Sequence, residues 1–161
     1  MPYKNGNHWT TICSDGTRVR ETEDENDTKF KFDFAENADV MITKFCDAGC
    51  QYCHEGATVN GKHADLRSMT NLWDSWVPGT EIAIGGGNAL AHPDIEWFTE
   101  YLSSRGVVCN ITVNQKHIWD EKLEKMIKAE HVKGIGISLT NSASDADMNR
   151  IRYLEAISHR N

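Results

Sequence analysis

The sequence predicts an α/β fold built from parallel β-α units, and three observations favour it. From residue 39 onward, short apolar runs alternate with longer segments whose apolar residues recur at helical spacing. The chain has 161 residues, 39% hydrophobic and 25% charged, so it can bury an apolar core. Before residue 39, alternating runs flank an Asp-Gly pair instead. We therefore expect a β-hairpin extension over residues 1–38 and an α/β core over residues 39–161.

Composition and charge narrow the class of protein. No run approaches the roughly 20 apolar residues of a transmembrane helix, and residues 1–8 lack the apolar segment of a signal peptide. A cytoplasmic protein without a membrane partner is therefore expected. The formal net charge of −7 argues against a nucleic-acid partner, which usually selects a basic surface. Five cysteines in such a chain indicate metal or redox use rather than disulfides.

The first part of the chain reads as a hairpin. The alternating runs 9–13 and 17–20 flank residues 14–16, and an Asp-Gly pair between such runs is a strong turn signal. In residues 30–34, three phenylalanines alternate with charged residues, which predicts either a third short strand or an extended segment leading into the core. Cys13 falls within a predicted strand and is expected to be a small buried hydrophobe.

The second part of the chain predicts four strands, each followed by a helix. Pro78 and Gly79 end the first helix, and Pro93 suits the opening turn of the second. Cys109 alternates with apolar residues inside the third strand, so it too is expected to be buried. The predicted strands are residues 40–43, 81–84, 107–113 and 134–139, and the helices carry the apolar sets Leu66, Met69, Leu72, Trp73, Trp76; Ile95, Phe98, Tyr101, Leu102; Trp119, Leu123, Met126, Ile127; and Met148, Ile151, Leu154, Ile157.

Polar or glycine-rich elements follow all four predicted strands. In a parallel β/α barrel, catalytic groups lie at the carboxyl ends of the strands, so such elements come together at one edge of the sheet. We therefore expect a single polar face that carries the functional site. Its elements are a cysteine-rich loop after the first strand, residues 85–88 after the second, Asn114 and Gln115 after the third, and Ser138 and Thr140 after the fourth.

Cys46, Cys50 and Cys53 form the most specific pattern in the chain. Three thiolates in a short loop can hold three corners of a [4Fe-4S] cluster and leave the fourth iron to a non-protein ligand. A closed structural metal site normally takes four protein ligands. The odd number of cysteines therefore indicates an open, catalytic iron.

With Tyr52 directly before the last cysteine, the spacing Cys-x3-Cys-x2-Cys resembles the signature of the radical S-adenosylmethionine (radical SAM) superfamily. This resemblance implies an enzyme in which Cys46, Cys50 and Cys53 hold a [4Fe-4S] cluster whose open iron binds S-adenosylmethionine. In that family, one electron from the cluster cleaves the cofactor to a 5′-deoxyadenosyl radical, which abstracts hydrogen from a substrate. The protein supplies binding and orientation. The substrate is unknown from the sequence.

The resemblance also implies residues that bind S-adenosylmethionine. Residues 86–94 are similar to the family segment Gly-Gly-Glu-Pro-Leu-Leu-His-Pro-Asp, in which the glycines and the glutamate contact the cofactor amine. Gly86 and Gly87 match that segment, but Asn88 replaces the glutamate. An amide oxygen accepts a hydrogen bond from the amine but contributes no charge. By the same comparison, Tyr52 lies against the adenine ring, and Asn114 and Ser138 lie near the ribose and the carboxylate.

The number of predicted strands departs from the family pattern. A radical SAM core has six β-α units, and about four are readable in this chain, so the resemblance implies an incomplete (β/α) barrel. An open edge at the fourth strand would present unpaired backbone groups. A further polypeptide, a second copy or the rest of a longer protein could cover it. The resemblance further implies an electron donor such as flavodoxin or ferredoxin.

Other interpretations of the cysteines stay open. Cys46, Cys50, Cys53 and His54 could close a tetrahedral zinc site in a non-catalytic binding module. The chain could also be a truncated remnant that holds a cluster without turnover. Residues 50–54 match the c-type haem attachment pattern as well, but that chemistry belongs to exported proteins.

Overall fold

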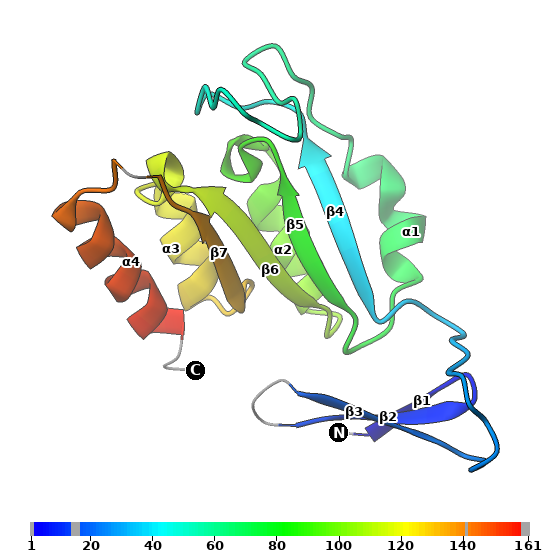
Figure 1. Ribbon diagram of the computed structural model, residues 1–161. Helices are drawn as coiled ribbons and strands as arrows, with labels where there is room; N and C mark the ends of the chain where they lie inside the picture. The colour runs from blue at the N-terminus through cyan, green and yellow to red at the C-terminus, as the bar shows by residue number, and fades with distance from the viewer. Residues whose placement is uncertain (1, 14–16, 141, 159–161) are drawn as a thin grey trace. The chain divides into compact units, whose positions relative to one another are not determined.

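The computed structural model describes residues 2–13, 17–140 and 142–158. The chain divides into two compact units, Met1–Glu36 and Asn37–Asn161 (Figure 1). The first holds a three-stranded antiparallel sheet and the second a four-stranded parallel sheet with helices. The predicted α/β class is thereby confirmed. The domain boundary placed between residues 38 and 39 stays a prediction.

The N-terminal unit contains one strand more than the sequence predicted. Its sheet has the order β1-β2-β3, and the predicted hairpin corresponds to β2 and β3, whose turn at residues 14–16 lies outside the described residues. The extra strand pairs with β2 across Gly6 and Asn7, and Gly6 has φ +63°. The signal was the Gly6-Asn7 pair, because glycine at the first central position suits a two-residue hairpin turn. The bounds are β1 Pro2–Asn5, β2 His8–Ile12 and β3 Arg18–Thr22.

Residues 30–34 form no strand but an irregular segment that packs on the N-terminal sheet. The rings of Phe30 and Phe32 meet the buried ring of His8 edge-on, at centroid distances of 4.9 and 4.8 Å. Of the two alternatives predicted for this segment, the third strand is therefore not formed. It leads to Glu36, which accepts hydrogen bonds from Tyr3 and three other side chains of the sheet.

The core unit carries the parallel sheet in the order β4-β5-β6-β7. Each strand lies within a few residues of its predicted range, because apolar alternation marks buried strands well. Within the described residues, β7 pairs with β6 alone. The elements are β4 Asn37–Thr43, α1 Thr70–Asp74, β5 Glu81–Gly86, α2 Ile95–Ser103, β6 Val108–Asn114, α3 Glu121–Lys128, β7 Gly134–Ser138 and α4 Asp145–Ser158, with 3-10 turns at Arg67–Met69, Ala89–Ala91 and Gln115–His117.

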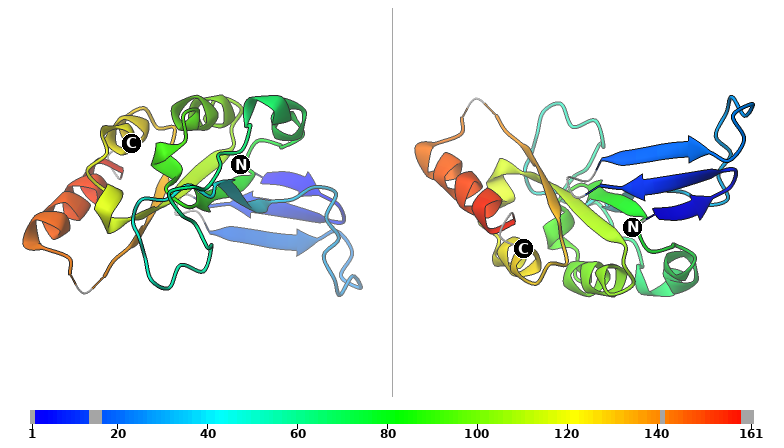
Figure 2. Two further views of the ribbon diagram at one scale, coloured as in Figure 1. Left: turned by 90° about the horizontal axis from the view of Figure 1, so that it is seen from above. Right: turned by 90° about the horizontal axis from the view of Figure 1, so that it is seen from below.

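The apolar core lies on one face of this sheet. Helices α1, α2 and α3 cover that face (Figure 2). The buried core cluster includes Ile42, Ile84 and Ile111 from the strands, and Phe98 and Leu123 from the helices. Alternate residues point to the other face, which no described helix covers. On that face Met41 pairs with Gly85, and Thr112 with Gly136. The small residues leave it open at the carboxyl ends of the strands.

Three helical predictions differ from the structure. The first predicted helix, over residues 66–76, is only a 3-10 turn followed by the short α1, with Leu66 and Trp73 buried. Trp119 precedes α3. Its side chain is half exposed and lies beside Arg150, so it is not part of the buried apolar face of that helix. In α4 only Leu154 is fully buried. No helix of the described residues is both long and apolar enough to cross a bilayer.

The two cysteines outside the loop differ in environment. Cys109 is buried in β6, as predicted, and burial raises the pKa of its thiol to about 12. Cys13 is exposed, so its predicted burial was wrong. It lies directly after Ile12, the last residue of β2, where alternation no longer fixes the side chain.

Candidate functional site

The three clustered cysteines lie in the segment that follows β4. Residues 44–64, which we call the cysteine loop, leave the carboxyl end of that strand and return beside it (Figure 1). Cys50 is exposed, and Cys46 and Cys53 are half-buried. All three line one cavity of about 540 Å³. The loop thus gathers three thiol donors at one opening.

Backbone hydrogen bonds fold the cysteine loop onto itself. The N–H of Cys46 donates to the carbonyl of Thr58 over 2.9 Å, and the N–H of Thr58 donates to the carbonyl of Lys44 over 3.0 Å. A Cβ on Gly61 would stand 1.8 Å from the Lys44 carbonyl oxygen. Glycine is therefore required where the returning segment crosses the strand exit.

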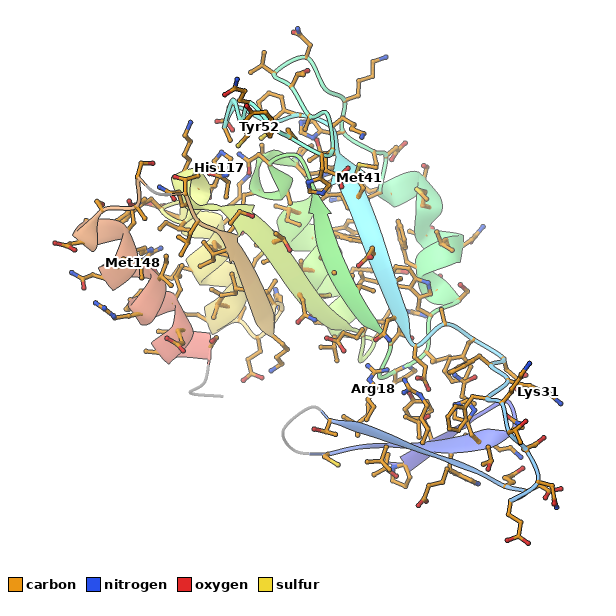
Figure 3. All side chains as sticks on the ribbon, in the orientation of Figure 1. Arg18, Lys31, Met41, Tyr52, His117 and Met148 are labelled. Carbon is orange, nitrogen blue, oxygen red and sulfur yellow. The ribbon has the colours of Figure 1, made fainter. Side chains whose placement is uncertain are left out.

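Side chains from the ends of β5 and β6 hold the first half of the loop. His117 Nε2 lies 2.8 Å from Asp47 Oδ1, and Asn88 Nδ2 donates to the same oxygen over 3.1 Å. Lys116 Nζ donates to the Ala48 carbonyl. Figure 3 shows His117 and Tyr52 at the same end of the sheet. The strand ends therefore converge on the loop, as the parallel topology predicts.

Asp47 is the charged centre of these contacts. Burial raises the pKa of its carboxyl group, but hydrogen bonds from its own backbone N–H, from Asn88 and from His117, together with the charge of His117, outweigh that effect. The pKa of Asp47 consequently lies below its ordinary value. The side chain is therefore an ionised carboxylate at neutral pH.

The glycine run after β5 brings backbone close to the cysteine loop. The N–H of Gly87 donates to the carbonyl of Thr43 over 2.8 Å, and the N–H of Asn88 donates to the carbonyl of Phe45 over 2.7 Å. A Cβ on Gly87 would stand 2.1 Å from the Phe45 oxygen, whereas a Cβ on Gly85 would meet nothing within 4 Å. Gly85 therefore opens the cavity, and Gly87 allows the contact between strand end and loop.

The predicted site residues fall around one opening. Besides the cysteines, the cavity is lined by Tyr52, Gly86, Gly87, Asn114 and Ser138. Tyr52 is 90% exposed and packs on no aromatic ring of the described residues. Their assignment to particular parts of a cofactor stays a prediction.

Two of the predicted residues make contacts that the sequence did not suggest. Asn114 Nδ2 lies 3.6 Å from Cys50 Sγ, within hydrogen-bond range of a cysteine ligand. Asn88 is 7% exposed, does not line the cavity, and reaches Asp47 instead. Both side chains thus support the cysteine loop.

Asp47, Lys116 and His117 were missed by the sequence analysis. Lys116 and His117 directly follow the third strand, so the rule that functional groups gather at strand ends could have found them. Asp47 lies between two of the cysteines, where a loop carboxylate carries no pattern of its own.

The donor set fits a cluster held at three corners. Among the described residues, no group of three or more His, Cys, Asp or Glu side chains converges on the position of a single metal ion. His54, the fourth ligand of the alternative zinc site, is 91% exposed in its side chain and lies 3.2 Å from Glu55. The three thiols line one cavity of about 540 Å³.

A second hollow lies within the N-terminal unit. It measures about 840 Å³ and is lined by residues 20–30, most of them acidic or polar. Asp24 accepts hydrogen bonds from Asn26 there, which lowers the pKa of its carboxyl group. This hollow contains none of the predicted site residues.

The parallel α/β fold with three cysteines in the loop after its first strand gives the class of fold and site, and comparison with known proteins gives the family. The sequence model of the radical SAM superfamily matches residues 40–160, so the chain belongs to that superfamily. A curated relative is 7-carboxy-7-deazaguanine synthase of Aquifex aeolicus (strain VF5), which is 28% identical over 89 residues. The match covers 54% of this chain and 40% of the relative. The chain thus spans less than half the length of that enzyme.

Proposed function

We propose that this chain is a radical SAM enzyme whose Cys46, Cys50 and Cys53 thiolates hold a [4Fe-4S] cluster. The observation that carries the proposal is the placement of three cysteines, with no fourth among the residues that the structure describes, on one cavity at the carboxyl end of a parallel sheet. When bound, the cluster passes one electron to S-adenosylmethionine and yields methionine and a 5′-deoxyadenosyl radical, which takes a hydrogen atom from the substrate.

The chain's own residues bind and orient in this proposal. Gly86 and Gly87 contribute backbone to the wall of the cavity that would hold the cofactor, and Tyr52 contributes an exposed ring to the same wall. Asn114 and Ser138 present polar groups from the ends of β6 and β7. A one-electron donor such as flavodoxin or ferredoxin reduces the cluster, and a second chain along β7 is a further proposed partner.

Iron loading tests the cluster. After anaerobic reconstitution with iron and sulfide, the wild-type chain should hold about four irons. Replacing Cys46, Cys50 or Cys53 by alanine should remove most of that iron. Cys13→Ala is the matched control, because Cys13 is an exposed cysteine outside the loop, and its iron content should equal that of the wild type. Zinc at one per chain without iron or sulfide would instead identify the non-catalytic zinc module.

Cofactor cleavage tests the activity. Adding S-adenosylmethionine should change the electron paramagnetic resonance spectrum of the reduced cluster, because only an iron without a protein ligand can bind it. Reduced protein should then release 5′-deoxyadenosine, measured by chromatography. Iron loading without that spectral change or product would identify an inactive remnant.

A further inference from the structure

The charged residues within the four strands of the core sheet are both acidic. Asp39 lies in β4 and Glu81 in β5, and no Lys, Arg or His occurs within the described bounds of β4–β7. Ile42 and Ile84 belong to the buried core, so the alternation of side chains places Asp39 and Glu81 on the opposite, uncovered face. The strands therefore give that face negative charge and no positive charge.

Asp39 lines the same cavity as the three cysteines. It is exposed and makes no hydrogen bond or ion pair with any residue that the structure describes. Glu81, in contrast, accepts a hydrogen bond from Asn110 over 2.6 Å and does not line the cavity. The other carboxylate of the cavity, Glu55, lies 3.6 Å from Lys44 Nζ. Asp39 is thus the carboxylate of this cavity that is left for a ligand.

The surroundings of Asp39 leave room for such a ligand. Asp39 pairs with Ala83 across the sheet, and Met41, the next residue on the same face, pairs with Gly85. A Cβ on Gly85 would meet nothing within 4 Å, and Met41 is 49% exposed. Ala83, Met41 and Gly85 all line the cavity. The carboxylate therefore has open space beside it, next to an adaptable apolar side chain.

Asp39 and the cysteine loop lie at two chemically different ends of the cavity. Thr43, the last residue of β4, is four positions after Asp39, which corresponds to about 13 Å along an extended strand. The cysteines follow that end of the strand. A ligand that fills the cavity consequently meets thiols at one end and an unpaired carboxylate at the other.

The charge at the carboxylate end selects the kind of ligand. Among the described residues, no Lys or Arg lines the cavity, so a phosphate or carboxylate group beside Asp39 would meet like charge without a compensating cation. A cationic nitrogen group would instead form a charge-assisted hydrogen bond with it.

We infer that Asp39 is a specificity-determining residue that binds a cationic nitrogen group of the substrate, an ammonium or a guanidinium. This inference rests on the proposed function and names the substrate class. The substrate carries its positive charge on the part that reaches β4, while its reacting part faces the cysteine loop.

The test uses two probes of one shape, N-butylguanidinium and N-butylurea, which differ in charge. The dissociation constants of both for the full chain are measured at low ionic strength by nuclear magnetic resonance titration, from the amide signal of Ala83 and its neighbours. The wild type should bind the guanidinium about two- to fivefold more tightly than the urea, the range for an exposed ion pair. Added salt should reduce that preference.

Asp39→Asn should abolish the preference and leave the affinity for N-butylurea unchanged. Glu55→Gln, which changes the other carboxylate of the cavity, is the matched control and should keep the preference. In reconstituted protein saturated with S-adenosylmethionine the preference should persist, because Asp39 lies away from the cysteine loop. Circular dichroism establishes that each variant is folded.

Three outcomes would overturn the inference. Equal affinities of the wild type for the two probes would show that Asp39 attracts no cation. A loss of the preference in Glu55→Gln instead of Asp39→Asn would move the cation site to the cysteine loop. Displacement of the guanidinium by S-adenosylmethionine would assign Asp39 to the cofactor. Absence of iron after reconstitution, with the preference intact, would contradict the proposed function and not the cation site, so the two failures are distinguishable.

Discussion

At the scale of single residues, Asn114 has the clearest contact with the cluster ligands. Its Oδ1 accepts the N–H of Lys116 over 3.0 Å, which turns the amide nitrogen toward Cys50 Sγ. Hydrogen bonds to ligand sulfurs are among the factors that set the reduction potential of an iron–sulfur cluster. A donor stabilises the extra negative charge of the reduced state, so this amide should raise the potential.

Replacing Asn114 should therefore lower the reduction potential of the bound cluster. Asn114→Asp keeps the acceptor for Lys116 and exchanges the donor for a negative charge, so the shift should be larger than in Asn114→Ala. A redox titration followed by electron paramagnetic resonance measures it. The matched control is Asn110→Ala on the same strand, whose amide donates to Glu81 over 2.6 Å. An unchanged or higher potential in both Asn114 variants would contradict this role.

Residue spacing indicates the cysteines that we propose as ligands, but it does not indicate the residues that hold their loop in place. The three cysteines and the glycines are local in sequence, so their roles can be read from spacing and from strand ends. The contacts among Asp47, Asn88 and His117 join residues up to 70 positions apart. They depend on the path of the loop after β4. The pairing of β4 with β5 shifts register between Met41 and Thr43, just before that loop, and no local sequence pattern encodes this shift.

At the scale of elements, the joint between β5 and the cysteine loop tolerates little change. The backbone N–H groups of Gly87 and Asn88 both donate to carbonyls of the strand exit, Thr43 and Phe45. Backbone meets backbone here, so a new side chain atom has no flexible neighbour to displace. Two glycines of the same run, Gly85 and Gly87, therefore differ sharply in what they permit.

Gly87→Ala should destabilise the core unit and reduce its iron content. The new Cβ would stand 2.1 Å from the Phe45 oxygen, and forced backbone shifts of this kind cost about 1–3 kcal/mol. Thermal unfolding by circular dichroism and iron analysis measure the two effects. Gly85→Ala is the matched control, because its Cβ meets nothing within 4 Å. Equal behaviour of the two variants would show that the close contact has no energetic weight.

Element types were predictable where the apolar pattern is strong. Strands β5 and β6 and helix α2 follow directly from alternation and from helical spacing. The helix predicted over residues 66–76 was too long, because Leu66 and Trp73 are buried by a 3-10 turn and a single α turn together. Leu66 and Trp73 lie seven positions apart, and two buried residues at that spacing fit a continuous helix equally well. The spacing therefore could not distinguish the two arrangements.

At the scale of the whole molecule, the two units are stabilised by interiors of different chemical character. The core unit has an apolar interior, whereas the N-terminal unit is organised around the carboxylate of Glu36. Burial raises the pKa of Glu36, but hydrogen bonds from Arg20, Thr10, Tyr3 and Asn5 outweigh it and bring the pKa to about 2. The stability of the N-terminal unit should therefore depend strongly on acid.

The N-terminal unit should lose stability between pH 4.5 and pH 2. The folded pKa of Glu36 lies below its ordinary value of 4.5, so the stabilisation is complete above that pH and disappears as the pH falls toward 2. The difference corresponds to about 3 kcal/mol. Amide hydrogen exchange of β1–β3, measured by mass spectrometry at pH 6 and pH 3, should show the loss.

Glu36→Gln gives the control for this pH dependence. The amide cannot ionise, so exchange in β1–β3 should already be faster at pH 6 and should change little more by pH 3. Glu21→Gln, on the same sheet, replaces a residue outside this hydrogen-bond network and should behave as the wild type. A wild-type profile that is flat between the two pH values would exclude Glu36 as the source of acid sensitivity.

Protein contacts tie the cysteine loop to the sheet through Asp47, Ala48 and Cys50. We therefore expect folding of the polypeptide itself to meet part of the conformational entropy cost of ordering this segment. Loading and loss of the inorganic centre should consequently be reversible at constant backbone structure. Apoprotein stored without iron should accept it rapidly, at a rate set by assembly chemistry rather than by refolding.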